Sequence, residues 1–251
     1  MRIGKFLSVF MLLAELTGSA LAQDRDRQIE RVEDAGSVLS EIMSAPDRGI
    51  PEEILGSAKC VAIVPSLLKG GFVFGGQYGH GVASCRTDAG WSAPAFFGVK
   101  GGSFGLQIGA QAVDLIMLVM NERGMRNLLS SKFQLGADAS VAVGPVGRHA
   151  EGATDWKMRA EVLTYSRARG LFGGITMNGA LVKQDSEDTR LFYGRMVTYR
   201  TLLMGKMEAP ADAGPFLNAL GKYAPNPKPT PIEKPETKPE SKGAGNSPAN
   251  E

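Results

Sequence analysis

Glycine limits what this chain can fold into more than any other residue, because it recurs inside and between segments that have the composition of β-strands. The chain has 32 glycines in 251 residues, against a usual share of about 7%. No Gly-X-Y repeat accompanies them, which excludes collagen. The β-rich segments are 61–64, 72–74, 91–99, 104–108, 115–120, 137–143, 160–165 and 174–182. Glycine inside a strand marks a bulge, a bend or a close backbone approach, so the pattern predicts a strongly curved sheet.

Helical periodicity is found in the N-terminal part and in short segments between the strands. Residues 24–44 carry apolar side chains three and four positions apart, and Pro51 suits the first turn of a short second helix. Asn121 and Asp185 are placed to cap two further helices. The chain is therefore predicted to be an α+β protein. We expect N-terminal helices packed on a curved, glycine-rich antiparallel β-sheet that is sandwich- or barrel-like.

The first 22 residues have the order of a secretory signal peptide. Arg2 and Lys5 precede an apolar run at 6–13, and Ala20-Leu21-Ala22 gives the small-x-small cleavage pattern. The run is shorter than the roughly 20 residues that span a bilayer, although a retained membrane anchor remains the alternative. We expect an exported protein that is periplasmic or secreted and that can associate with a membrane.

The C-terminal end differs in composition from the rest of the chain. Residues 224–251 contain seven of the 14 prolines, alternating with Lys and Glu, and such a stretch is expected to be disordered. The predicted organisation is a signal peptide at 1–22, a helical segment at 23–56, a main domain at 57–205, an extension at 206–223 and the tail at 224–251.

The two cysteines, Cys60 and Cys85, are predicted to form a disulfide if the protein is exported. Closing a loop of about 25 residues would stabilise the fold by roughly 3.5 kcal/mol on the chain-entropy model. A hairpin turning near Leu68 would instead set Cys60 opposite Gly76, so two separate buried thiols remain the alternative. With only His80 between the cysteines, no metal site is predicted.

Two classes of function have little support in the residues. A formal net charge of +2 leaves no basic surplus for general nucleic-acid binding. Gly101-Gly102-Ser103-Phe104-Gly105 matches a nucleophile elbow, but residues 106–109 alternate like a strand where the elbow requires a helix. No phosphate loop is present. We therefore expect no catalytic residue and no cofactor, with a serine hydrolase using Ser103 as a remote alternative.

An ordered set of motifs resembles one known family. The motifs are residues 58–65, 90–94, 101–109, 129–133, 135–140, 165–167 and 170–172, within a match from about Ser57 to Gly194. Together they resemble the SYLF family of lipid-binding domains, which includes yeast actin-patch proteins. The resemblance implies a non-enzymatic module that binds anionic lipids. Because export would separate this chain from a cytoskeleton, actin is not expected as a partner, and protein partners are not predicted. A bacterial anionic phospholipid or membrane surface is the expected ligand.

Lipid binding requires clustered cations beside apolar side chains, because each Lys or Arg near an anionic membrane contributes about 1 kcal/mol. Arg167, Arg169, Leu171 and Phe172 form the best local combination, although a solvated hairpin turn is the alternative. The full set of candidates is Lys69, Lys100, Lys132, Arg148, Arg167, Arg169, Leu171, Phe172 and Lys183. The leading hypothesis is a lipid-binding module of the bacterial envelope; the alternative is a structural or envelope-interaction protein without lipid activity.

Overall fold

The structure, a computed structural model, describes residues 24–45, 49–71, 74–104, 109–146, 160–168 and 171–225. The predicted signal peptide, the tail after Pro225, and the candidate residues Arg148 and Arg169 lie outside the described residues.

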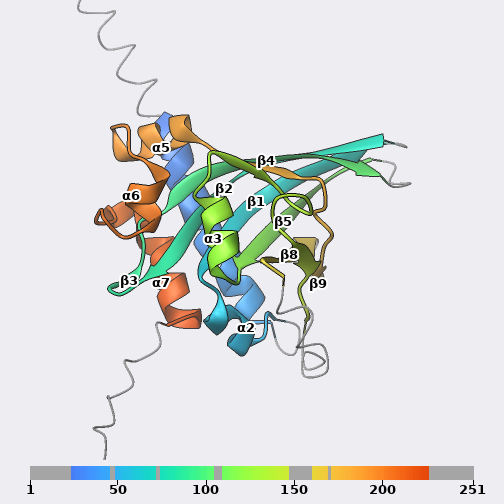
Figure 1. The fold of residues 1–251 in the computed structure, drawn as a ribbon, viewed down its shortest axis with the longest axis horizontal. Coiled ribbons are helices and arrows are strands. Elements are labelled where there is room, and N and C mark those ends of the chain that lie inside the picture. Colours follow the sequence, from blue (N-terminus) through green and yellow to red (C-terminus); the bar gives the residue numbers. More distant parts are fainter. Residues whose placement is uncertain are drawn as a thin grey trace, which may run out of the picture.

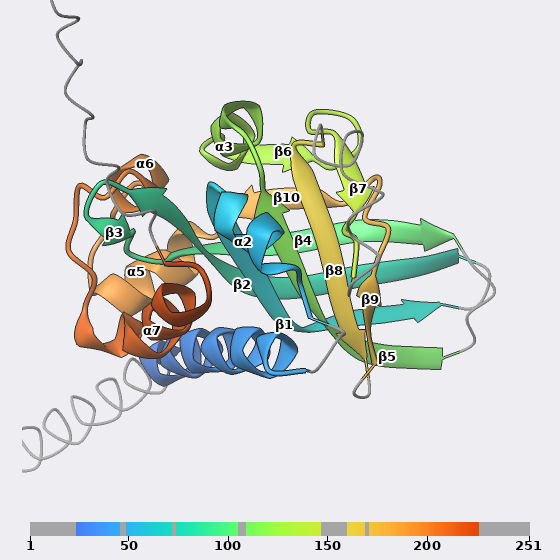
Figure 2. The same cartoon turned by 90° about the horizontal axis from the view of Figure 1, so that it is seen from below.

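A single curled sheet of ten strands forms the centre of the fold (Figures 1 and 2). The strands run in the order β6-β10-β4-β2-β1-β5-β8-β7, with β3 paired to β2 and β9 paired to β8. All pairs are antiparallel except β7 with β8. The bounds are β1 (Cys60–Gly71), β2 (Phe74–Thr87), β3 (Gly90–Trp91), β4 (Ala95–Phe104), β5 (Gly109–Val119), β6 (Lys132–Gln134), β7 (Val141–Val143), β8 (Val162–Ala168), β9 (Leu171–Gly174) and β10 (Leu181–Gln184).

Helices cover both sides of this sheet. They are a long helix over 24–43, α2 (Glu52–Ser57), α3 (Glu122–Leu128), α5 (Ser186–Tyr193), α6 (Tyr199–Leu203), the short 3-10 helix η2 (Ala211–Ala213) and α7 (Gly214–Tyr223). The helix over 24–43 and α7 bury Leu39 and Phe216 against one side, which we call the helix face. On the other side, the α3 face, Leu128 and Leu202 pack over residues such as Phe97. The α+β prediction with a curved sheet is confirmed.

Several local predictions are also confirmed. The Asn121 side chain accepts hydrogen bonds from the amides of Arg123 and Gly124, and that of Asp185 accepts from the amide of Asp188, so both residues cap helices as expected. Residues 115–120 are a fully buried segment, with apolar side chains packed on both faces of the sheet.

Two predicted strands are shorter than expected, and two helices, α6 and α7, were not predicted. Only 141–143 of the segment 137–143 is a strand, because the chain turns at Gly136 with a φ of 85°. The segment 174–182 is likewise interrupted, since β9 ends at Gly174 and a turn at Gly179, with a φ of 83°, precedes β10. Glycine at positive φ favours a turn over an extended strand.

A β-bulge in β1 changes which side chains reach each face. The register of β1 against both β2 and β5 shifts by one residue between Ile63 and Leu68. Ser66 lies in this shift with a φ of 54°, and its amide donates to Asp114 Oδ1 on β5 at 3.0 Å. Since side chains alternate between faces, one extra residue reverses the alternation along the rest of the strand. Leu68 therefore lies on the helix face and Lys69 on the α3 face.

The strand glycines fall into two groups. A Cβ on Gly79 would lie 2.6 Å from Val64 Cγ1, and a Cβ on Gly81 would lie 2.3 Å from the Ile63 carbonyl oxygen. At these positions glycine is required by the close approach of β1. At Gly98 the nearest atom would be 3.9 Å away, and at Gly102 nothing lies within 4 Å. The second group has no steric reason to be glycine.

The predicted disulfide is present. Cys60 lies directly opposite Cys85 in the β1–β2 pair, and their sulfur atoms are bonded at 2.05 Å. The expectation of a hairpin turning near Leu68 was wrong, because Gly71 pairs with Gly75 and the strands reverse between these two residues.

Removing this cross-link should destabilise the protein without changing its fold. We expect the Cys60→Ala/Cys85→Ala variant to lose about 3 kcal/mol of unfolding free energy, since the bond closes a loop of about 25 residues in the unfolded chain. Urea denaturation under non-reducing conditions measures the loss. Alkylation of both cysteines in the unfolded, unreduced wild-type protein would contradict the disulfide.

Candidate functional site

Part of the helix face is uncovered, and six exposed side chains gather on it. Leu68, Tyr78, Lys100 and Leu181 form one row across β1, β2, β4 and β10, because each lies directly opposite the next. Lys183 and Lys132 form a second, parallel pair on β10 and β6. Side chains directly opposite each other in antiparallel strands share a face. The exposed fractions are 56% for Leu68, 43% for Tyr78 and 36% for Leu181. We call these six residues the open face.

The charges of the open face are unbalanced. Lys183 lies directly opposite Lys132, an arrangement of like charges that destabilises a sheet. Among the described residues, none of the three lysines forms an ion pair with a carboxylate. The Lys100 ammonium lies 5.2 Å from the centre of the Tyr78 ring. The open face therefore offers positive charge beside apolar and aromatic surface.

A groove of about 570 Å³ runs along the open face to the beginning of α5. Its residues come from β2, β4, β10 and the first turn of α5, and include Tyr78, His80, Gly98, Lys100, Lys183 and Glu187. Gly98 lies between His80 and Lys183 in the register of the three strands.

A network of charges closes one end of this groove. His80 Nδ1 lies 3.0 Å from Asp185 and 3.3 Å from Asp188, and its Nε2 contacts the Tyr78 hydroxyl. The bond to Asp185, followed by that to Asp188, raises the pKa of His80 to about 10. Asp188 also accepts from Gln28 at 2.7 Å and pairs with Arg31, both on the helix over 24–43. The network joins this helix to β2 and α5.

The same network has the ligand types of a metal site, since His80, Asp185 and Asp188 bring three ligand atoms within 4.8 Å of one another. A protonated His80 and Arg31 already neutralise the two carboxylates. A metal ion would have to displace a proton that is held with a pKa of about 10. The charges therefore favour an ion-pair network over a metal site at His80, Asp185 and Asp188.

Arg167 lies in a second ion-pair network instead of at a free turn. Its guanidinium lies 2.7 Å from Asp114 and also pairs with Glu41 on the helix over 24–43. Burial raises the pKa of Asp114. Phe172 stacks on Tyr165 with ring centres 5.7 Å apart, whereas Leu171 is 67% exposed. Of the combination predicted from the sequence, only Leu171 is a free surface side chain among the described residues.

The structure thus brings together three of the predicted cations, Lys100, Lys132 and Lys183. Lys69 lies on the α3 face, where burial lowers its pKa. Leu68, Tyr78, Leu181 and Gly98 were not predicted from the sequence. Alternation within each strand signals that Leu181 and Lys183 share a face, but the pairing of β10 with β4, about 80 residues earlier, carries no local signal.

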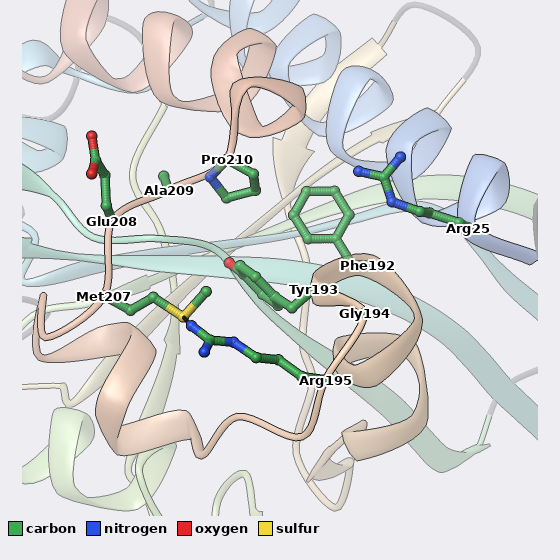
Figure 3. A pocket seen from close by; sticks show the side chains of 9 residues that line it. All are labelled: Arg25, Phe192, Tyr193, Gly194, Arg195, Met207, Glu208, Ala209 and Pro210. Atoms are coloured by element: carbon green, nitrogen blue, oxygen red, sulfur yellow. Dashed lines mark hydrogen bonds between the residues drawn. The ribbon is translucent and has the colours of Figure 1, made fainter.

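A second groove, of about 440 Å³, lies between α5 and the segment before η2 (Figure 3). Arg25 at its rim pairs with Asp212, and Tyr193 donates to the Pro94 carbonyl at 2.6 Å. Arg195 lies beside Met207, with Nη2 3.7 Å from the sulfur. Glu208 adds a negative charge, so the groove has no excess charge that indicates a class of ligand.

The setting of a nucleophilic serine is not found in the part of the chain that the structure describes. Ser103 lies in β4 opposite Gly75, and the next described segment is β5, whereas an elbow requires a strand followed by a helix. Within the same described residues, none of the helices has the length and apolar character needed to cross a bilayer.

The network at His80 should make stability depend on alkaline pH. The pKa of His80 in the folded protein is raised from 6.5 to about 10. The contribution of His80 to the free energy of unfolding is therefore complete below about pH 6.5 and is lost as the pH rises through 10. Allowing for solvent screening of a half-buried group, we expect about 2 kcal/mol. Urea denaturation should show that His80→Gln has a lower free energy of unfolding than wild type at pH 7, and that this difference becomes smaller by pH 10. A difference that does not change with pH would contradict the assignment of a charged His80 to the network.

Arg167→Gln should lower the free energy of unfolding and leave the residues of the open face unchanged. Removing this cation leaves Asp114 partly buried without its partner, which typically costs about 1–3 kcal/mol. Thermal and urea denaturation measure the loss. Unchanged stability would show that the ion pair does not stabilise the fold. Arg167 would then again be a candidate for contact with the ligand.

Comparison with known proteins places this fold in a family. Residues 100–223 match the family model Ysc84, described as "Las17-binding protein actin regulator". SH3 domain-containing YSC84-like protein 1 is 32% identical over 182 residues in both Rattus norvegicus and Homo sapiens, covering 72% of this chain and 53% of the relative. Protein YSC84 of Saccharomyces cerevisiae is 34% identical over 184 residues, covering 72% of this chain and 39% of the relative.

The chain thus spans about half the length, or less, of these relatives. A further relative from yeast is named LAS seventeen-binding protein 3, with 32% identity over 188 residues. The family model, the relatives and the motifs read from the sequence agree, and the chain belongs to the Ysc84, or SYLF-domain, family.

Proposed function

We propose that this protein is a non-enzymatic lipid-binding module whose open face lies on a membrane surface rich in anionic phospholipids. The observation that carries the proposal is the set of three lysines that have no carboxylate partner in the described part of the chain, held on one face beside Leu68, Tyr78 and Leu181.

The charge of the open face is sufficient for measurable binding to an anionic membrane. Three lysines near an anionic surface contribute about 3 kcal/mol together, which is more than 100-fold in affinity. Tyrosine is favoured at membrane interfaces because its ring is apolar and its hydroxyl can remain in water. All six side chains project from the same sheet face, so they can approach one membrane surface together.

The family provides the context for this proposal and for its alternative. The relatives are named for Las17 binding and for an SH3 domain, and those names describe those proteins. For this chain, the signal-like order of residues 1–22 supports export, so we propose an envelope phospholipid as ligand in place of actin. The alternative is an envelope protein whose open face binds another protein.

Vesicle co-sedimentation tests the proposal. We expect the protein to bind vesicles of phosphatidylcholine containing about 30% phosphatidylglycerol or cardiolipin, and to bind pure phosphatidylcholine much less. The binding should weaken with salt, since the surface potential is screened within about 8 Å at physiological ionic strength. Lys100→Gln/Lys183→Gln should weaken it by about 30-fold, the effect of removing roughly 2 kcal/mol.

Lys206→Gln/Lys222→Gln is the matched control, because it removes the same charge from exposed positions next to α6 and in α7. An equal loss in the control would show that only net charge matters and would contradict the assignment to the open face. Salt-independent binding to neutral and anionic vesicles alike would refute the electrostatic mechanism, and no binding to either would favour the alternative.

A further inference from the structure

We infer that the groove over Gly98 is a defined site for one phosphate group of a phospholipid, held between Lys100 and Lys183. This inference rests on the proposed function and deepens it, because it predicts one stoichiometric lipid site within a surface that otherwise attracts the membrane by its charge.

The first argument is the floor of the groove. Gly98 is in the interior of β4, where glycine weakens a strand, and yet a Cβ there would meet nothing closer than 3.9 Å. The absence of a side chain at Gly98 therefore leaves the floor of the groove open, whereas glycine at Gly79 and Gly81 is required by the close approach of β1. Gly98 has His80 opposite it on one side and Lys183 on the other, so a side chain would fill the groove between them.

The second argument is the charge around that floor. His80 and Arg31 are balanced by Asp185 and Asp188. Glu187 at the rim pairs with Arg190 at 2.5 Å. Among the described residues that line the groove, this leaves the ammonium groups of Lys100 and Lys183 without a carboxylate partner. Two such cations suit a phosphate, which accepts several hydrogen bonds and carries negative charge.

The third argument distinguishes a lipid from a free phosphate. Tyr78 and Leu181 lie on either side of Lys100, directly opposite it on β2 and β10, and both are exposed. A ligand whose phosphate lies over Gly98 would place its adjoining atoms against these two side chains. Apolar contact there favours an amphiphile, with its glycerol and first acyl carbons beside Tyr78 and Leu181.

Gly98→Val tests the site without removing a charge. A Cβ at this position meets no atom closer than 3.9 Å and valine favours strands, so we expect stability not to fall, which urea denaturation of the variant checks. The probe is dihexanoyl phosphatidylglycerol below its micellar concentration, followed by calorimetric titration and by NMR shifts. We expect saturable binding of one lipid per wild-type protein, weakened at least 10-fold in Gly98→Val. Gly102→Val is the control, because it adds the same side chain to the same strand and face where nothing lies within 4 Å.

The outcomes separate the inference from the proposed function. The site is supported if Gly98→Val and Lys100→Gln/Lys183→Gln both bind the soluble lipid more weakly than wild type while Gly102→Val binds it with unchanged affinity. Inorganic phosphate and glycerol 3-phosphate should bind at least 10-fold more weakly; equal affinity of either would overturn the lipid assignment. If anionic vesicles bind wild type but the soluble lipid does not saturate, or if Gly98→Val binds it normally, the inference fails and the proposed function stands. If the wild-type protein binds neither the anionic vesicles nor the soluble lipid, both the inference and the proposed function fail.

Discussion

The bulge at Ser66 is the constraint on which the rest of the structure depends. One extra residue in β1 reverses the alternation of its side chains, so that Leu68 lies in line with Tyr78 and Lys100 on the helix face. Without the bulge, Leu68 would point to the α3 face and Lys69 would take its place. Asp114 holds the bulge by accepting from the Ser66 amide, and the same carboxylate accepts from Arg167. A single partly buried acid thus connects the course of β1 to the helix over 24–43, since Arg167 also pairs with Glu41 on that helix.

Arginines and lysines have different roles in this fold. Arg31 joins the helix over 24–43 to Asp188 on α5, and Arg167 on β8 pairs with Glu41 of the same helix and with Asp114 on β5. These roles suit a planar group that can bind two acceptors at once. Lys100, Lys132 and Lys183 have no such partner among the described residues and remain on the part of the sheet that the helix does not cover. Binding of an anionic surface at the open face would therefore not compete with the ion pairs that stabilise the fold.

Several signals that lie within a few residues of one another were predicted correctly from the sequence, whereas the helices α6 and α7 and most of the contacts between distant strands were not. The caps at Asn121 and Asp185 and the buried run 115–120 depend on local chemistry, and the structure confirms them. The residues of the open face come from five strands, with β10 pairing to β4 and β6, so only the fold brings them together. Arg167 and Phe172 have the composition of a membrane contact, but Arg167 pairs with the carboxylates of Asp114 and Glu41, which are distant in sequence. Phe172 stacks on Tyr165 of the adjacent strand β8, a pairing that depends on how β8 and β9 are aligned. The position of the first hairpin turn was missed because Gly70, Gly71, Gly75 and Gly76 offer several places for the chain to reverse.

The most direct test of the central claim is to locate the membrane on the protein. Amide NMR spectra would be recorded in bilayer nanodiscs that contain phosphatidylglycerol and a small fraction of lipid with a paramagnetic headgroup. The account predicts that line broadening is centred on residues 98–100, 181–183 and Tyr78, and that it disappears in nanodiscs of phosphatidylcholine alone. Broadening centred on the helix over 24–43, or on the groove around Arg195, would contradict the assignment of the open face as the membrane-binding surface.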